Sequence, residues 1–344
     1  MSPAKDVLAV LRGQRPGRVP IWLMRQAGRY LPEYRTVRSQ SKSFLEMCLT
    51  PALAVEVTLQ PIRRYPLDAA IIFSDILVVP YALGQQVTFE GGQGPQLDPV
   101  RSQDQLERLS LAGVAERLGP VAVAIGSVRR ELPANVALFG FAGAPWTVAS
   151  YMVEGRGGTN FETIKAWAYR EPESFDRLIS LLTEATSAYL LQQIEAGAEI
   201  VQIFDSWAGV LSGPMLERWC VQPTAAIVRR VKTVHPDVPI IVFPRGVGAS
   251  YKRYAKICGC DGLSLDTTVP TAWASAELQP VLAVQGNLDP LALVEGGAAM
   301  EREARHILEA FGHERFIFNL GHGIVPQTPT EHVAELCRLV HDWT

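Results

Sequence analysis

The apolar run Val19-Pro20-Ile21-Trp22-Leu23 leads directly into Met24-Arg25-Gln26-Ala27-Gly28-Arg29-Tyr30, a stretch that carries two arginines four residues apart. Seven further short apolar runs follow, and each also ends in a polar or glycine-rich cluster. They lie at residues 69–73, 136–141, 200–204, 239–243, 262–265, 281–284 and 315–319. Most of the runs are continuously apolar, which is typical of strands buried on both faces of a parallel sheet.

Helical patterns separate these runs. One begins at Thr50-Pro51, with threonine at the N-cap and proline at the first helical position. The others cover approximately residues 172–197, 214–234, 250–258, 290–311 and 329–343. Eight strand and helix units predict an α/β fold, a single (β/α)8 TIM barrel that forms one domain over residues 1–344. An open doubly wound sheet is the alternative, but no Gly-x-Gly-x-x-Gly follows any of the runs.

The segment 75–135 is too long for one loop and one helix. Within it, Val87-Thr88-Phe89-Glu90-Gly91-Gly92 and the following Gly94-Pro95 predict a small hairpin inserted after the second strand. The sequence shows neither a low-complexity linker nor a short-period repeat, which favours one domain.

Composition narrows the class of protein. Hydrophobic residues make up 48% and charged residues 19% of the 344 residues, as in a globular protein. The net charge of -3 argues against nucleic-acid binding by bulk charge. Five cysteines without a Cys-x-x-Cys pair fit free thiols in a reducing compartment. We see no signal peptide and no run of the roughly 18 apolar residues that a membrane span needs, so we expect a cytoplasmic protein that does not bind membranes.

The active site of such a barrel lies where the strands end. Arg25 and Arg29 follow the first strand, and two arginines four apart could clamp an anion, although such a pair could also simply solvate a loop. Asp75 follows the second strand in apolar surroundings, and its simpler role would be that of a helix N-cap. For Asp205 and Asp266 we prefer either this role of helix N-cap or a role in positioning neighbouring site residues.

Three other strand ends carry candidate residues. Tyr151, like Trp146, follows the third strand and could serve only in packing. Ser206 follows the fourth strand and could be a helix cap. His322 stands between two glycines, which would let the backbone approach a ligand closely, so this histidine could bind an anion or titrate; a structural histidine is the alternative.

Several catalytic patterns do not occur. The chain has no Gly-x-Ser-x-Gly elbow, no His-Glu-x-x-His pair, no phosphate-binding loop and no lysine at a strand end for a Schiff base. The residues therefore predict an anion-recognising site with a carboxylate and with neither a cofactor nor a metal.

Several stretches resemble the uroporphyrinogen decarboxylase family, from about residue 4 to the end of the chain. The similar stretches are Pro20 to Arg29, Phe73 to Leu77, Gly140 to Thr147, Gln285 to Pro290 and Asn319 to Gly323. The resemblance implies a (β/α)8 barrel and the conversion of uroporphyrinogen III into coproporphyrinogen III by loss of four acetate carboxyl groups. It also implies a homodimer.

The resemblance assigns roles to individual residues. Asp75 would accept the pyrrole N–H groups and stabilise a cationic intermediate, and Arg25 would bind carboxylate and help in proton delivery. The remaining substrate-binding residues implied are Gln26, Ala27, Gly28, Arg29, Phe44, Tyr151, Ser206 and His322. Arg245 receives no role, since its surroundings vary within the family. The alternatives are a corrinoid- or zinc-dependent methyltransferase of the same fold and a porphyrinogen-binding protein without activity.

Overall fold

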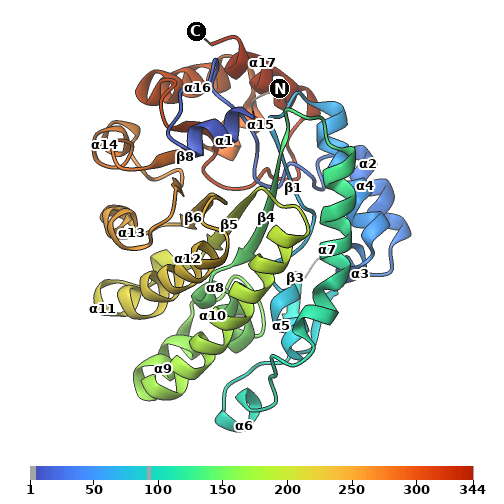
Figure 1. The fold of residues 1–344 in the computed structure, drawn as a ribbon, viewed down its shortest axis with the longest axis vertical. Coiled ribbons are helices and arrows are strands. Elements are labelled where there is room, and N and C mark those ends of the chain that lie inside the picture. The colour runs from blue at the N-terminus through green and yellow to red at the C-terminus, as the bar shows by residue number, and fades with distance from the viewer. Residues whose placement is uncertain (1–4, 91–93, 344) are drawn as a thin grey trace.

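The computed structural model describes residues 5–90 and 94–343. Seven parallel strands form one curled sheet, and helices surround it (Figure 1). The strands lie in chain order and are β1 (Ala69–Ile71), β4 (Ala137–Gly143), β5 (Ile200–Asp205), β6 (Ile240–Pro244), β7 (Gly262–Ser264), β8 (Ala283–Leu288) and β9 (Phe316–Leu320). All seven fall on predicted runs, and β8 continues four residues beyond the run at 281–284.

The first run, residues 19–23, is the remaining one of the eight, and it does not form the predicted regular strand. It makes a single parallel bridge, between Ile21 and Phe318 of β9. On one side the amide of Phe318 donates to the carbonyl of Pro20 (2.8 Å), and on the other the amide of Asp68 donates to the carbonyl of Ile21 (2.9 Å). Pro20 has no amide hydrogen, and the amide of Ile21 is taken by the Asp68 carboxylate (2.8 Å), so a continuous ladder cannot form.

The interior of the curled sheet is filled by alternate residues of the strands. Phe139 of β4, Ile241 and Phe243 of β6 and Ile317 of β9 belong to one buried cluster, as side chains of period two require. Helix α1 (Asp6–Leu11) adds Val7, Val10 and Leu11 to this cluster. Since Leu11 packs close to Gly262 at the start of β7, α1 covers the end at which the strands begin.

Most predicted helices occur near their expected positions. The α-helices that follow α1 along the chain are α2 (Pro32–Gln40), α3 (Phe44–Leu49), α4 (Pro51–Arg64), α5 (Val78–Leu83), α6 (Gln103–Leu106), α7 (Val114–Glu131), α8 (Pro145–Glu154), α9 (Glu162–Arg170), α10 (Pro172–Glu195), α11 (Gly213–Leu216), α12 (Gln222–Val234), α13 (Tyr251–Ile257), α14 (Thr271–Glu277), α15 (Pro290–Glu295), α16 (Gly297–Phe311) and α17 (Thr330–His341). Thr50 is the N-cap residue of α4, but its side chain makes no cap hydrogen bond.

Two helical predictions need correction. The helix expected over residues 290–311 is two helices, α15 and α16, separated at Gly296, whose φ is +67°. Any side chain at 296 would also overlap the ring of His332, with a Cβ only 2.5 Å from Nδ1. The helix expected over 214–234 contains a π-helical turn at Glu217–Val221 between α11 and α12.

A separate two-stranded sheet lies between β1 and β4 in the chain. β2 (Val87–Glu90) pairs antiparallel with β3 (Gly94–Leu97). Gly91 and Gly92 of the expected hairpin lie outside the described residues. Among the described helices, none combines the length and the apolarity that crossing a membrane requires.

Candidate active site

Polar side chains collect where the strands end, on the side opposite α1. In β5 and β6 the paired residues Phe204 and Phe243 contact each other with ring centroids 6.1 Å apart. Phe243 belongs to the interior cluster, and Phe204 packs against it. Ser206 and Arg245 are the first residues after β5 and β6, two positions beyond this pair of phenylalanines. The strands thus deliver these two polar residues to the open end of the sheet.

The loop that carries the two arginines is held by Gln26. The Oε1 atom of this fully buried glutamine accepts from the amide of Leu23 (3.1 Å), and its Nε2 donates to the carbonyl of Ala69 in β1 (3.0 Å). The Gln26 side chain is therefore committed to the fold. Its backbone is bonded as well, since the amide donates to the carbonyl of Leu23 (3.0 Å) and the carbonyl accepts from the Tyr30 hydroxyl (2.8 Å). Ala27 and Gly28, beside it, are half-buried.

Arg25 has a backbone conformation that few residues with side chains adopt. Its φ is +61°, in the left-handed region, which costs of order 1–3 kcal/mol and is typical of functional sites. Gly323 makes room for it, since a Cβ at 323 would lie 2.6 Å from Cγ of Arg25. The loop after the first run and the loop after β9 are thus fitted to each other at this arginine.

Three arginines at this end have no counter-charge in the protein. Arg25 and Arg29 are exposed and Arg245 is half-buried. No hydrogen bond or ion pair joins their guanidinium groups to any other residue in the described ranges 5–90 and 94–343. Arginines elsewhere, such as Arg64 and Arg253, have carboxylate partners. Unpaired guanidinium groups in one place favour binding of an anion with several charges.

Asp75 lies in the loop between β1 and α5. Its Oδ1 accepts from the amide of Leu77 (2.8 Å), the N-cap residue of α5, so one oxygen serves the turn before the helix, close to the simpler role considered above. The other oxygen has no partner among the described residues. Burial raises the pKa of the Asp75 carboxyl to about 6, although the Leu77 amide and the charge of Arg25 act to lower it. A carboxyl with this pKa can exchange a proton near neutral pH.

Residues from several elements surround Asp75. The charge of Asp75 helps to raise the pKa of Tyr151 on α8, a shift caused first by burial, and Arg25 opposes that shift. The electrostatic link places Arg25, Asp75 and Tyr151 near one another. Phe44 at the start of α3 lies between Phe73 and Phe89, with ring centroids 5.5 and 4.9 Å away, and forms an aromatic wall beside this loop.

His322 is held in one uncharged form. Its Nδ1 accepts from the amide of Gly323 (2.7 Å), which assigns the ring proton to Nε2. Burial, followed by the charges of Arg25 and Arg245, lowers the pKa of His322 to about 4. At neutral pH this histidine is therefore a neutral donor rather than a cation.

The glycines on either side of His322 are required by packing within the protein. A Cβ at 321 would lie 2.5 Å from the amide nitrogen of Thr267, and a Cβ at 323 would overlap Arg25. The close approach of the backbone to a ligand stays a prediction.

Asp205 is not the N-cap residue of either helical segment that follows it, since those residues are Trp207 and Ser212. Its Oδ1 accepts from Oγ1 of Thr147 (2.6 Å), and the same threonine oxygen accepts from the amide of Trp207 (3.0 Å). The buried pair of Asp205 and Thr147 therefore fixes the loop that carries Ser206, which is the supporting role named as one expectation. Thr147 itself received no role from the sequence, although it closes the Gly140 to Thr147 stretch.

Asp266 likewise positions backbone. Its Oδ2 accepts from the amide of Gly246 (2.7 Å), and its Oδ1 accepts from the amide of Thr268 (2.9 Å). Burial acts to raise its pKa, but these bonds, with others from the Thr268 and Tyr251 hydroxyls, leave the pKa lowered. Trp146 is fully buried and stacks on Trp219, so packing accounts for it.

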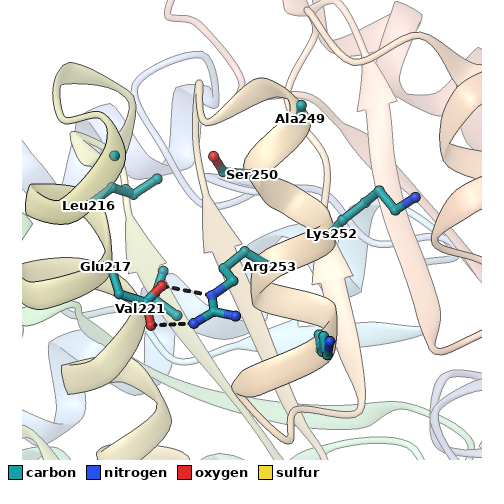
Figure 2. Close-up of a pocket in the computed structure, with 9 residues that line it drawn as sticks. Leu216, Glu217, Val221, Ala249, Ser250, Lys252 and Arg253 are labelled. Carbon is teal, nitrogen blue, oxygen red and sulfur yellow. Dashed lines mark hydrogen bonds and ion pairs between the residues drawn. The ribbon is translucent and has the colours of Figure 1, made fainter.

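A cavity of about 490 Å³ lies elsewhere, between the helical segments that follow β5 and β6 (Figure 2). Arg253 and Glu217 face each other across it in a bidentate ion pair. None of the predicted site residues lines this cavity. Within the described residues, no group of three or more histidine, cysteine or carboxylate side chains is arranged to hold a metal ion.

Known proteins resemble this chain over its whole length. A model of the family described as uroporphyrinogen decarboxylase (URO-D) matches residues 2–343. A uroporphyrinogen decarboxylase from Rhodospirillum rubrum is 53% identical over 336 residues, which are 98% of this chain and 97% of that protein. The enzyme of the same name from Sphingopyxis alaskensis is 51% identical over 336 residues, 98% of each chain.

Among solved structures, a methyltransferase from Methanosarcina mazei superposes with a TM-score of 0.80 over 97% of this chain and 96% of that one. The two sequences are 21% identical, so this likeness concerns the fold alone. The family match and the two close relatives carry the assignment instead. The chain therefore belongs to the uroporphyrinogen decarboxylase family, and it is a carboxy-lyase.

Proposed function

We propose that this site removes the carboxyl group from each of the four acetate side chains of uroporphyrinogen III and so yields coproporphyrinogen III. The observation that carries the proposal is the arrangement at the strand ends: a carboxylate with one unbonded oxygen beside arginines that lack counter-charges. A substrate with many peripheral carboxylates and a centre of N–H donors matches such an arrangement.

The reaction needs an electron sink, because loss of CO2 leaves an electron pair on the acetate carbon. The pyrrole ring itself supplies the sink. A proton added to a ring carbon creates an iminium-like cation, the bond to the carboxyl carbon breaks, and its electron pair neutralises the cation. A second proton added to the resulting exocyclic carbon completes the methyl group, and the ring carbon then releases the first proton, which restores the pyrrole; the net change is one proton taken up and one CO2 released.

Asp75 takes the central role in this scheme. Its carboxylate accepts the pyrrole N–H groups and stabilises the cation, an electrostatic contribution that increases as charge develops. Arg25, for whose side chain Gly323 leaves room and whose charge acts to lower the pKa of Asp75, binds a substrate carboxylate and assists proton delivery.

The other predicted residues bind the periphery of the substrate. Arg29 pairs with a carboxylate, and Tyr151, Ser206 and neutral His322 donate hydrogen bonds to others. The backbone of Gln26, Ala27 and Gly28 lies between the two arginines. Phe44 contributes an apolar wall.

The test is product formation under anaerobic conditions with purified protein, after dialysis and with a metal chelator present. We expect one coproporphyrinogen III and four CO2 per uroporphyrinogen III. A strict requirement for added zinc or pyridoxal phosphate would overturn the mechanism. Binding without turnover would favour a carrier, and methyl transfer without CO2 release would favour a methyltransferase.

We infer that the curled sheet is closed as an eight-stranded (β/α)8 barrel in one domain over residues 1–344. The hydrogen bonds that residues 20 and 21 make to β9 and to Asp68 before β1 support this closure. The antiparallel pair of β2 and β3 supports the hairpin insertion.

We also propose that the enzyme is a cytoplasmic homodimer. All five cysteines are free thiols, and four of them are buried, in keeping with a reducing compartment. Analytical ultracentrifugation of the purified protein at micromolar concentration tests the dimer, and a monomer at that concentration would overturn it.

A further inference from the structure

Arg245 is mounted rigidly at the end of β6. Its amide donates to the carbonyl of Asp205 (3.1 Å), and its carbonyl accepts from the amide of Gly209 (3.0 Å), so the loop after β5 holds it on both sides. Gly209 packs directly on Gly246, where a Cβ at 209 would lie 2.6 Å from the Gly246 carbonyl oxygen. The amide of Gly246 is in turn fixed by Asp266.

The position of Arg245 follows from the strand before it. Ile241 and Phe243 of β6 belong to the interior cluster, and Arg245 is the first residue after this strand, two positions beyond Phe243. The register pairs Asp205 with Pro244, so Arg245 lies one step beyond, beside Ser206. Phe243 contacts the ring of His322, with centroids 6.5 Å apart. Arg245 therefore lies at the open end of the sheet near both Ser206 and His322.

A half-buried guanidinium without a carboxylate partner is available to bind an anion in a charge-assisted hydrogen bond. His322 cannot supply charge to such an anion, because its Nδ1 is occupied and the ring is neutral. Arg25 and Arg245 are the charged groups whose fields reach this ring. A carboxylate that accepts a hydrogen bond from His322 thus needs an arginine for charge balance.

We propose that Arg245 is a substrate-positioning residue that binds a peripheral carboxylate of the tetrapyrrole together with Ser206 and His322. The guanidinium supplies the positive charge, and the hydroxyl and the Nε2–H group orient the carboxylate. This inference rests on the proposed function and adds a third arginine to the two that the sequence singles out.

The experiment compares Arg245→Gln and Arg245→Lys with Arg230→Gln. Arg230 is an exposed residue of α12 away from the strand ends, so its variant has the same net charge as Arg245→Gln. We expect Arg245→Gln to raise KM for uroporphyrinogen III by about tenfold to a hundredfold while kcat changes by less than about threefold. Arg245→Lys should recover part of the loss, and Arg230→Gln should match the unmodified enzyme.

A second readout is the titration of His322, followed by NMR of the ring protons. Removal of the neighbouring charge in Arg245→Gln should raise the pKa of His322, whereas Arg230→Gln should leave it unchanged. If the unmodified enzyme does not decarboxylate uroporphyrinogen III, the proposed function and this inference fail together. If it does, and Arg245→Gln behaves like Arg230→Gln in both KM and the titration, this inference alone is overturned.

Discussion

Asp68 precedes strand β1 and Asp75 follows it, and the two carboxylates differ in how many hydrogen bonds they accept from the protein. Asp68 is almost fully buried and satisfied: its carboxylate accepts from Arg18 (2.7 Å), from the amide of Ile21 (2.8 Å) and from His341 of α17 (2.9 Å). Asp75 accepts one bond, from Leu77. At one end of the sheet the Asp68 carboxylate connects distant parts of the chain. At the other end the Asp75 carboxylate keeps one oxygen without a partner among the described residues.

The same contrast holds for the cations. At the end where the strands begin, Lys5 pairs with Glu199, and Lys232 pairs with Asp261. At the end where they finish, Arg25, Arg29 and Arg245 have no partners among the described residues. Ion pairs that are largely buried are satisfied within the fold, whereas arginines without a carboxylate partner are available to bind an anion. The difference distinguishes the end of the sheet where charges are paired within the fold from the end at which we propose the active site.

The largest effect on activity is expected for Asp75→Asn. Asparagine keeps the shape and still accepts from Leu77, but it removes the charge that stabilises the pyrrole cation. We predict at least a hundredfold lower kcat, since one such electrostatic contribution is worth ~2.7–4 kcal/mol. Steady-state kinetics, with circular dichroism as the folding control, measure this. Near-normal turnover in the folded variant would reduce Asp75 to a turn residue.

The isosteric change at the other end of β1, Asp68→Asn, should act on stability instead. It leaves Arg18 and His341 without their carboxylate, and we expect a loss of about 2–4 kcal/mol in the free energy of unfolding, moderated because the Arg18 side chain is 40% exposed. Urea denaturation gives the value, and kcat of the folded fraction should stay within about twofold. Loss of activity in fully folded Asp68→Asn would contradict the distinction between a structural Asp68 and a catalytic Asp75.

Arg29→Ala tests the role of the arginines that have no carboxylate partner among the described residues. Because Arg29 is exposed and unpartnered, its removal should leave the unfolding free energy unchanged and weaken substrate binding by ~1.5–3 kcal/mol. The comparison is kcat/KM at limiting substrate against the melting temperature. Unchanged kinetics would mean that this arginine only solvates its loop.

The smallest effect is the protection given by ligand. Coproporphyrinogen III at ten times its Kd should stabilise the folded protein by about 1.4 kcal/mol. Thermal scans under anaerobic conditions should show this in the unmodified protein and in Asp68→Asn, and less of it at the same concentration in Arg29→Ala. A melting temperature indifferent to saturating ligand would argue for another class of substrate.

The sequence predicted most of the strands because continuous apolar runs such as 200–204 and 239–243 encode burial on both faces locally. It could not predict that residues 19–23 lack a regular ladder, since the Asp68 carboxylate that takes the Ile21 amide lies 47 residues away. The break at Gly296 was missed for a similar reason: the ring that requires a glycine there belongs to His332, in another helix.

The candidate site likewise has features that the sequence could predict and features that depend on tertiary contacts. Arg25, Asp75 and His322 follow strand ends, so their common location could be inferred. The tautomer of His322, the fixed side chain of Gln26 and the bond from Thr147 to Asp205 depend on tertiary hydrogen bonds. Arg245 was left without a role because its proposed place in the site depends on tertiary contacts, namely its backbone bonds to Asp205 and Gly209 and the contact of Phe243 with His322.

The central claim is that the Asp75 carboxylate lowers the stability of the folded protein for the sake of function. It is tested most directly by the unfolding free energy of Asp75→Asn as a function of pH. The folded-state pKa of about 6 lies above the ordinary 3.8, so the folded protein holds this proton more tightly and loses stability as pH rises from about 4 to 6. Asparagine has no such loss. We predict that Asp75→Asn is more stable than the unmodified protein at pH 7.5, by at most about 3 kcal/mol, and that most of the gain is gone at pH 4. A variant that is equally or less stable at pH 7.5 would contradict the account.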